Sequence, residues 1–235
     1  ANLVTVDVDG PVSQNEICYI ITSDVKLMAE VIRIGGKNAY IQVFESTRGL
    51  KTETAVEFTG HMLEATLGPG ILSKNFDGLQ HDLDKMEGVF LKKGDYTAAL
   101  ETDKLWTFKP LAKPGEVVLA GSWLGEVKEN WIPHKIMVPF TFKGTFTVME
   151  IKPEGAYKIN DTIAILIDKE NQKHKVSMVQ KWPVKIPIKA YKEKPRPFDF
   201  METGIRVIDS LNPIVEGGTG FIPGPFGTGK TVLQH

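Results

Sequence analysis

Short stretches in which apolar and polar residues alternate recur through the first 72 residues. Along the chain they read LVTVDV, EICYII, LMAEVIRI, AYIQVF and AVEFTG. Turn-forming residues separate them, as in Asp9-Gly10-Pro11 and in the GGKN sequence that starts at Gly35. A period of two is typical of strands with one buried face, and closure into a barrel removes the exposed edges of a sheet. The pattern predicts a small barrel or sandwich, and we expect a six-stranded β-barrel over residues 1–72.

The pattern changes twice in the following residues. Residues 73–110 show no sustained period, and we expect them to form a connector that packs on its neighbours. Alternation returns over residues 111–181, in EVVLAG, WLGEVKE, HKIMVPF, GTFTVMEI, TIAILID and KVSMVQKW. Turn signals such as Pro153-Glu154-Gly155 separate these stretches. The second run predicts a separate β-rich module.

Residues 182–235 have a third character. The stretch WPVKIPIKAYKEKPRPFDF is rich in proline and lysine, and it predicts an extended segment. Ile205, Ile208 and Leu211 then fall on one face of a short helix that Thr203 is expected to cap and that should end before Pro213. We expect GFIP to form a short buried strand after it, as at the start of an α/β P-loop domain.

The motif with the clearest chemistry is GPFGTGKT, which fits the phosphate-loop pattern G-x-x-x-x-G-K-S/T. Glycines allow several backbone N–H groups to converge on a phosphate, the lysine reaches the β- and γ-phosphates, and the threonine hydroxyl ligates Mg²⁺. The expected nucleotide-binding residues are Gly224, Pro225, Phe226, Gly227, Thr228, Gly229, Lys230 and Thr231. Lys230 is also the catalytic candidate, and Thr231 the metal ligand. The alternative interpretation of this motif is a glycine-rich surface turn that binds no phosphate.

Only Val232, Leu233, Gln234 and His235 follow the loop. A parallel nucleotide-binding sheet needs several strands joined by helices, and one helical turn is too short to overcome its own nucleation cost. We therefore expect the 235 residues by themselves to be catalytically inactive. An assembly or interaction module that lacks enzyme activity is one alternative for the chain.

Several stretches together carry a resemblance to a known family. IPGPFGTGKTVLQH and the preceding RVIDSLNPIVEGGTG resemble the catalytic A subunit of the V-type and A-type rotary ATPases. The likeness extends upstream, in the same order, through GPV at Gly10, AEVIRIGGKNAYIQVFESTRGL at Ala29, LGPGILSKNFDGLQ at Leu67, and HKIMVP followed by GTFTVMEI. Thr228 departs from the serine or alanine more familiar at its position. The module at 111–181 resembles the bulge domain of these subunits.

The resemblance implies a mainly β chain with a truncated RecA-like nucleotide-binding domain at 182–235, on which the 73–110 connector packs. It implies ATP hydrolysis or synthesis coupled to H⁺ or Na⁺ transport, with ATP or ADP and Mg²⁺ as cofactors. The implied partners are a B subunit, alternating with A subunits in a hexameric ring, and central and peripheral stalk subunits. Such a subunit lies at the cytoplasmic face of a membrane, which it contacts only indirectly.

Composition and charge argue against several other classes of function. The 28 basic and 29 acidic residues nearly cancel, so the chain as a whole shows no charge suited to nucleic acid. Cys18, the only cysteine, reads as an apolar strand residue, and no apolar run reaches the length of a membrane span. One basic run could contact the backbone of RNA, so a Rho-like, RNA-dependent ring ATPase is the second candidate function. A solvated linker is the simpler interpretation of this run. Its residues are Lys185, Lys189, Lys192, Lys194 and Arg196.

The remaining candidates for chemistry carry weak signals. The five histidines, His61, His81, His134, His174 and His235, lack the spacing of metal ligands, and we expect them in loops or at the surface. Asp77 and Asp82 flank GLQH, and paired acids in a polar connector are usually solvated or capping residues. We assign neither group a catalytic role.

Overall fold

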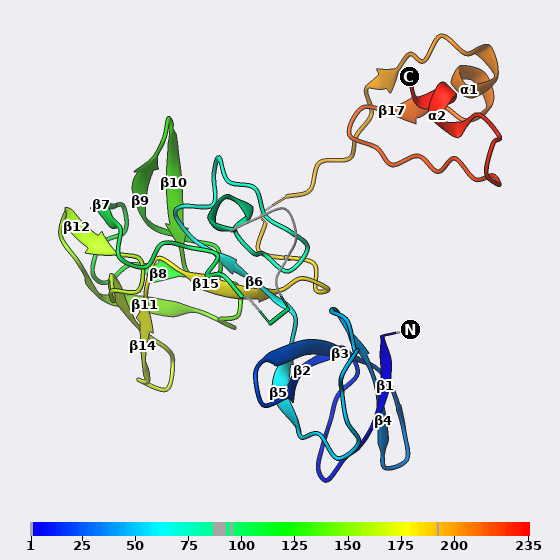
Figure 1. Ribbon diagram of the computed structural model, residues 1–235. Coiled ribbons are helices and arrows are strands. Elements are labelled where there is room, and N and C mark those ends of the chain that lie inside the picture. Colours follow the sequence, from blue (N-terminus) through cyan, green and yellow to red (C-terminus); the bar gives the residue numbers. More distant parts are fainter. Residues whose placement is uncertain (1, 87–92, 95, 192) are drawn as a thin grey trace. The chain divides into compact units, whose positions relative to one another are not determined.

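The computed structural model describes residues 2–86, 93–94, 96–191 and 193–235 (Figure 1). The chain divides into two compact units, Ala1–Ala190 and Tyr191–His235, and each is considered by itself. The regular elements described in the first unit are strands, apart from one 3₁₀ turn, as the alternating sequence pattern predicts.

The N-terminal sheet contains five antiparallel strands in the order β1-β4-β3-β2-β5. They are β1 (Leu3–Asp7), β2 (Glu16–Ile21), β3 (Lys26–Gly35), β4 (Asn38–Val43) and β5 (Val56–Met62). Each strand coincides with one of the five stretches in which apolar residues alternate to within one residue at the start and two at the end, so these sequence predictions are confirmed. The inward side chains form one core, made of Cys18, Ile20, Leu27, Ala29, Val31, Ala39, Ile41 and Val43.

The expectation of a sixth strand in this sheet is wrong for the described residues. The next strand, β6 (Glu64–Leu67), pairs antiparallel with β15 (Gln180–Pro183), far along the chain. The side chain of Gln80 then accepts a hydrogen bond from the N–H of Thr66 (2.7 Å) and donates one to its carbonyl (2.8 Å). The N–H and C=O groups of β6 are therefore paired with β15 and with the side chain of Gln80. They need no partner in the first sheet, and β6 does not join it.

The second module has two sheets of four strands each. One has the order β10-β9-β7-β12 and comprises β7 (Leu105–Pro110), β9 (Trp123–Glu129), β10 (Ile132–Met137) and β12 (Gly155–Lys158). WLGEVKE was predicted as a strand and coincides with β9. β7 was not predicted, because its sequence LWTFKP lies in the segment expected to be a connector.

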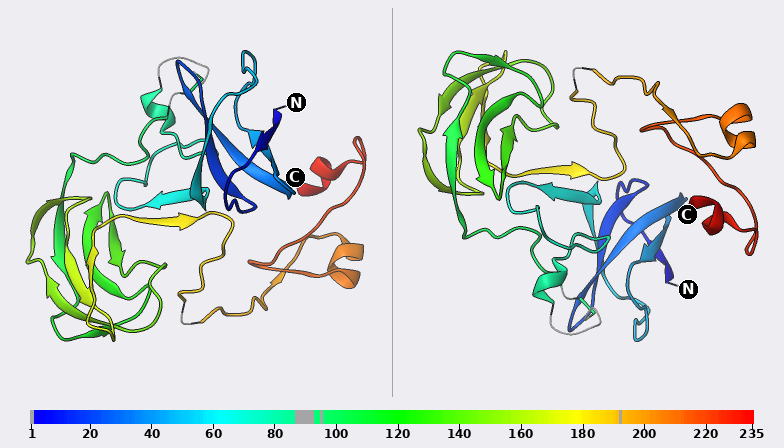
Figure 2. Two further views of the ribbon diagram at one scale, coloured as in Figure 1. Left: turned by 90° about the horizontal axis from the view of Figure 1, so that it is seen from below. Right: turned by 90° about the horizontal axis from the view of Figure 1, so that it is seen from above.

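The other sheet has the order β14-β13-β11-β8. It comprises β8 (Val117–Val118), β11 (Phe146–Ile151), β13 (Ala164–Ile167) and β14 (Lys173–Val176). Two buried clusters fill the module, and Ile151 packs against both, so the sheets share a continuous apolar interior. Both views in Figure 2 show these strands gathered into one group.

The segment between the first sheet and β7 contains little regular structure among its described residues, apart from the 3₁₀ turn η1 (Leu83–Lys85). It packs on the first sheet through Tyr96, whose hydroxyl receives a hydrogen bond from Met28 N–H (2.8 Å) and donates one to Glu45 (2.7 Å). Residues 87–92 and 95 of the expected connector lie outside the described residues. The domain boundaries drawn from the sequence stay a prediction.

The second unit contains the short ladder β16 (Phe200–Met201) with β17 (Ile214–Val215), the helix α1 (Arg206–Leu211) and the turn of helix α2 (Lys230–Gln234). α1 ends before Asn212, as predicted. Its N-cap is Ile205, so the predicted cap at Thr203 is wrong.

The GFIP sequence forms no strand, which corrects a second expectation for this unit. Its apolar residues suit a buried strand, but a strand needs a neighbour to satisfy its N–H and C=O groups. The only ladder among the described residues of the second unit joins β16 and β17. Phe221 of GFIP is accordingly almost fully exposed, and no P-loop domain is evident.

Gly125 in β9 tests the packing of the second module. A Cβ at this position would meet the ring of the buried Phe108 and lie 2.7 Å from the Lys109 carbonyl oxygen. We expect Gly125→Ala to lower the free energy of unfolding by about 1–3 kcal/mol, because the core has no room for the methyl group. Thermal unfolding followed by circular dichroism measures this change.

The matched control is Gly78→Ala, since a Cβ on Gly78 would meet no atom within 4 Å. We expect it to change the free energy of unfolding by less than about 0.5 kcal/mol. Equal losses in the two variants would contradict this account of the Phe108 contact.

Candidate functional site

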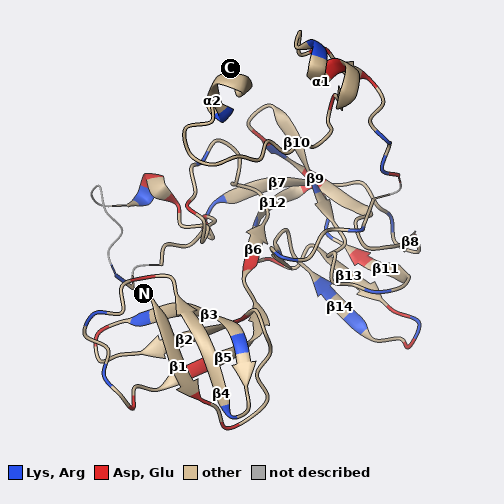
Figure 3. Ribbon diagram, turned by 90° about the vertical axis from the view of Figure 1, so that its right-hand side faces the viewer, with Lys and Arg blue, Asp and Glu red and all other residues tan. Residues whose placement is uncertain are grey.

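The phosphate-loop residues run from Gly224 to the first turn of α2. Gly227 (φ 83°) and Gly229 (φ 79°) both lie in the left-handed region, where a side chain would be strained. Gly229 is the N-cap residue of α2, and Lys230 begins the helix at the position that is blue in Figure 3. The first N–H groups of a helix have no partner inside it, so they point out of its N-terminus beside the lysine.

Two side chains of the loop fold back onto its backbone. The Lys230 ammonium donates a hydrogen bond to the carbonyl of Gly224. The Thr228 hydroxyl donates one to the carbonyl of Pro225 (2.8 Å). These bonds close the loop on itself. The residue type at Thr228 thus has a structural role, although the sequence pattern leaves that position free.

A shallow hollow lies beside the loop within the second unit. Its polar lining includes Thr228, Lys230 and Thr203, and its apolar lining includes Ile205 and Ile222. The structure therefore brings Lys230 and Thr228 together with the start of α1. Thr231 is not part of this lining, and Phe226 is fully exposed to solvent.

Asp209 is a residue of this unit that the sequence analysis did not select. One of its carboxylate oxygens accepts hydrogen bonds from the Thr203 hydroxyl (2.6 Å) and N–H (3.1 Å), and the other from the Gly204 N–H (3.1 Å). The hydrogen bond from Thr203 holds the pKa of Asp209 below its ordinary value. Asp209 thus fixes the turn that places Thr203 and Ile205 beside the loop. The sequence signal that could have identified Asp209 is a threonine-glycine pair whose threonine lies six residues before it.

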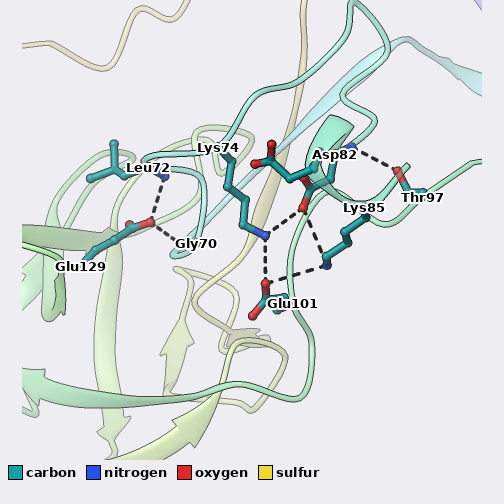
Figure 4. A network of polar contacts seen from close by, with 9 residues as sticks. Gly70, Leu72, Lys74, Asp82, Lys85, Thr97, Glu101 and Glu129 are labelled. Carbon is teal, nitrogen blue, oxygen red and sulfur yellow. Dashed lines mark hydrogen bonds and ion pairs between the residues drawn. The ribbon is translucent and has the colours of Figure 1, made fainter. Parts of the chain in front are cut away.

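A second polar cluster lies in the first unit, around Asp82 (Figure 4). The Asp82 carboxylate is fully buried and lies 2.9 Å from the Lys74 ammonium and 3.8 Å from that of Lys85. Glu101 faces the same two ammonium groups, at 3.0 and 3.9 Å. The hydrogen bond from Lys74 outweighs the effect of burial and holds the pKa of Asp82 below its ordinary value.

Asp77 and Asp82 act as capping residues, as expected, and Asp82 is buried, so the alternative of a solvated carboxylate is wrong for Asp82. Asp82 accepts a hydrogen bond from Asp84 N–H at the start of η1. Asp77 accepts hydrogen bonds from the N–H groups of Leu79 and His81, and from His81 Nδ1 (2.6 Å). Asp82 also has more distant partners, Lys74 and Thr97, which local sequence does not reveal.

Three histidines pair with carboxylates at short distance. His81 bonds to Asp77 (2.6 Å), His134 to Glu129 (2.6 Å) and His174 to Asp168 (2.8 Å). His81 is buried but lies in a loop, as one arm of the prediction has it, whereas His134 lies in β10 and His174 in β14. Within the described residues, no three histidine, cysteine or acidic side chains gather as a metal site would require.

The proline- and lysine-rich segment has the character of a linker. Val184 to Asp199 form no helix or strand where the structure describes them, and most of their side chains are exposed. Lys192, one of the basic run, lies outside the described residues. No described helix is both long and apolar enough to cross a membrane.

Comparison with protein families gives two matches. The β-barrel domain of the ATP synthase alpha/beta family matches residues 2–60, and the barrel-sandwich domain of ATP synthase alpha/beta subunits matches residues 97–185. The V-type ATP synthase alpha chains of Borrelia hermsii, Borrelia garinii subsp. bavariensis and Borreliella burgdorferi are 47%, 46% and 45% identical to this chain, each over 237 aligned residues.

The chain matches the N-terminal part of V-type ATP synthase alpha chains. The match includes all of this chain and 41% of each of these relatives, so the chain spans about two-fifths of their length. The resemblance drawn from the sequence is thereby confirmed. The two matched domains also agree with the mainly β fold.

The Asp82 cluster predicts a pH-dependent contribution to stability. A carboxyl whose pKa is lowered on folding stabilises the protein above its unfolded pKa, and this contribution is lost as the pH falls through the folded pKa. We expect Asp82→Asn to lower the free energy of unfolding by about 1.5–3 kcal/mol at pH 7, since it weakens a buried, charged hydrogen bond. The loss should shrink below pH 3.8, the ordinary value of the carboxyl.

Urea unfolding between pH 7 and acid pH measures both effects. The matched control is Glu101→Gln, because the Glu101 carboxylate contacts the same lysines with a side chain that is 46% exposed. An exposed ion pair contributes about 1 kcal/mol or less. Equal losses in the two variants, or a loss in Asp82→Asn that persists at acid pH, would count against the buried pair.

Proposed function

We propose that this chain supplies the N-terminal domains and the phosphate loop of a V-type ATP synthase catalytic subunit. In this role it takes part in ATP hydrolysis or synthesis coupled to the transport of H⁺ or Na⁺ across a membrane. The observation that carries the proposal is the intact GPFGTGKT loop, located in a chain that matches V-type ATP synthase alpha chains throughout. The proposed domains are 1–72, 73–110, 111–181 and 182–235.

The residues of the loop fit a Mg²⁺–nucleotide complex in their chemistry. Gly227 and Gly229 have backbone conformations that permit N–H groups to face an anion, and the Lys230 ammonium already binds an oxygen. We assign the phosphate cradle to residues 224–229, the β- and γ-phosphate contact to Lys230, and the Mg²⁺ contact to Thr231. With a nucleotide bound, Lys230 would hold the phosphates in position, and Mg²⁺ held by Thr231 would supply neutralisation of their charge.

The exposure of the phosphate loop argues against ATP hydrolysis by the 235 residues alone. Catalysis of phosphoryl transfer depends on positioning and on preorganised charges. Here residues 224–229 are exposed, α2 has five residues, and GFIP forms no supporting strand. We propose that this chain by itself does not hydrolyse ATP and that a polypeptide of the relatives' full length does.

The proposed partners follow from the same family. A B subunit alternates with this subunit in a hexameric ring, and central and peripheral stalk subunits connect the ring to a membrane part. The subunit then lies at the cytoplasmic face of the membrane without entering it, and it binds no nucleic acid. A Rho-like RNA-dependent ATPase is not proposed, because both matched domains belong to ATP synthases.

Lys230 provides the test of this function. We expect Lys230→Ala in the full-length polypeptide, assembled with its B subunit, to lower ATP hydrolysis by at least about 100-fold, because a preorganised charge on the phosphates is lost. Phosphate release measures the rate. The control Lys194→Ala removes an exposed lysine of the linker and should change the rate by no more than about twofold.

The 235-residue chain is measured alongside and should show no hydrolysis. Activity that survives Lys230→Ala would overturn the catalytic assignment. Activity of the short chain that Lys230→Ala abolishes would leave the loop assignment standing and refute the proposed inactivity.

A further inference from the structure

The residues that directly follow β15 are bound to the first unit, although they form no helix or strand. We call residues 184–190 the strap. At its start, the N–H of Val184 donates a hydrogen bond to the carbonyl of Leu63 (2.9 Å), which prolongs the pairing of β6 with β15. The indole N–H of Trp182 donates one to the carbonyl of Ile186 (2.7 Å). The first part of the predicted linker is thus fixed in place by its backbone.

The side chain of Lys185 ties the strap to the first sheet. Its ammonium donates hydrogen bonds to the side-chain oxygen of Asn15 (3.0 Å) and to the carboxylate of Glu30 in β3. The side chain of Glu30 is 13% exposed, and that of Lys185 is 46% exposed. Solvent therefore screens this pair less than it screens a pair that is fully at the surface. Among the described residues, Glu30 forms no ion pair with another cation.

The backbone of Asn15 places the second acceptor of Lys185. Asn15 has a φ of 67°, in the left-handed region that asparagine adopts more readily than most residues. Its N–H donates a hydrogen bond to the carbonyl of Val31 (2.7 Å), the residue next to Glu30 in β3. Both oxygens that accept from Lys185 are therefore attached to the same strand, and they form a prepared site for one ammonium group.

The far end of the strap lies against the turn before β9. A Cβ on Gly121 would lie 3.1 Å from both the Cβ and the carbonyl oxygen of Ala190. Gly121 has a φ of 81° and no side chain, so the strap can approach its backbone closely. The boundary between the two compact units falls directly after Ala190. The strap therefore belongs to the first unit, and the free connection to the second unit begins where the strap ends.

We propose that Lys185 latches the strap to the first sheet and thereby sets the reach of the connection to the second unit, which contains the phosphate loop. With the strap bound, nine residues (191–199) precede β16; with the strap released, sixteen residues (184–199) separate β15 from β16. An extended chain spans at most about 3.3–3.6 Å per residue, so release raises the greatest reach from about 30 Å to about 55 Å. The latch thus confines the second unit to a smaller volume, which raises its local concentration beside the first unit.

Limited proteolysis of the 235-residue chain tests the latch. At low trypsin concentration, the rate of cleavage after Lys189 follows the population of the released strap, and mass spectrometry identifies the fragments 1–189 and 190–235. We expect Glu30→Gln to raise this rate about 2- to 5-fold, because the charge that holds Lys185 is lost while the strap keeps its sequence. The matched control is Glu57→Gln, which removes the 61% exposed partner of an ion pair on the same sheet and should leave the rate unchanged.

A charge reversal separates the latch from a general loss of stability. Glu30→Lys places two ammonium groups together and should raise cleavage after Lys189 further, since like charges repel. Adding Lys185→Glu restores an opposite pair and should return the rate to within about twofold of the unchanged chain, whereas a merely damaged sheet would not recover. The latch is refuted by an unchanged rate in Glu30→Gln, by an equal rise in Glu57→Gln, or by a reversed pair that restores nothing. No nucleotide enters these measurements, so such a result would leave the assignment of the phosphate loop intact.

Discussion

The buried carboxylate of Glu129 holds together the segments that surround the start of the second module. A charge in a protein interior is costly unless hydrogen-bond donors surround it, and Glu129, at 3% exposure, has three of them. Two are backbone N–H groups of the LGPGIL turn, and the third is a ring nitrogen of β10. The turn that follows β6 is thereby fixed to β9 and β10. The strand just before this turn, β6, is fixed in addition by its antiparallel pairing with β15.

The sequence was most informative where a local pattern decides the structure. The five stretches of the first sheet and the stretch that became β9 were predicted correctly, because period-two burial is a property of neighbouring residues. β7 was missed, since LWTFKP lies next to charged and polar residues that hide its short alternation. The sixth barrel strand was wrongly placed because the partner of β6 lies more than a hundred residues away along the chain.

The candidate site shows the same division between local and distant causes. The phosphate-loop residues are contiguous, and a motif found them. The burial of Asp82 and Glu129 depends on Lys74, Thr97, Gly70 and His134, and no spacing rule connects these positions. The GFIP stretch shows that a local pattern alone is not enough to form a strand. Its pattern is typical of a strand, but no neighbouring strand lies beside it in the described residues.

The packing of the first sheet also determines the reactivity of the only thiol. Cys18 is fully enclosed between the strands next to β2, and burial raises its pKa to about 12. At neutral pH the fraction of reactive thiolate is then far below the few per cent of an ordinary free cysteine. Thiol reagents that label exposed cysteines will leave Cys18 untouched in the folded protein. A cysteine introduced on the surface can therefore carry a spectroscopic probe at one chosen position, without removal of the natural residue.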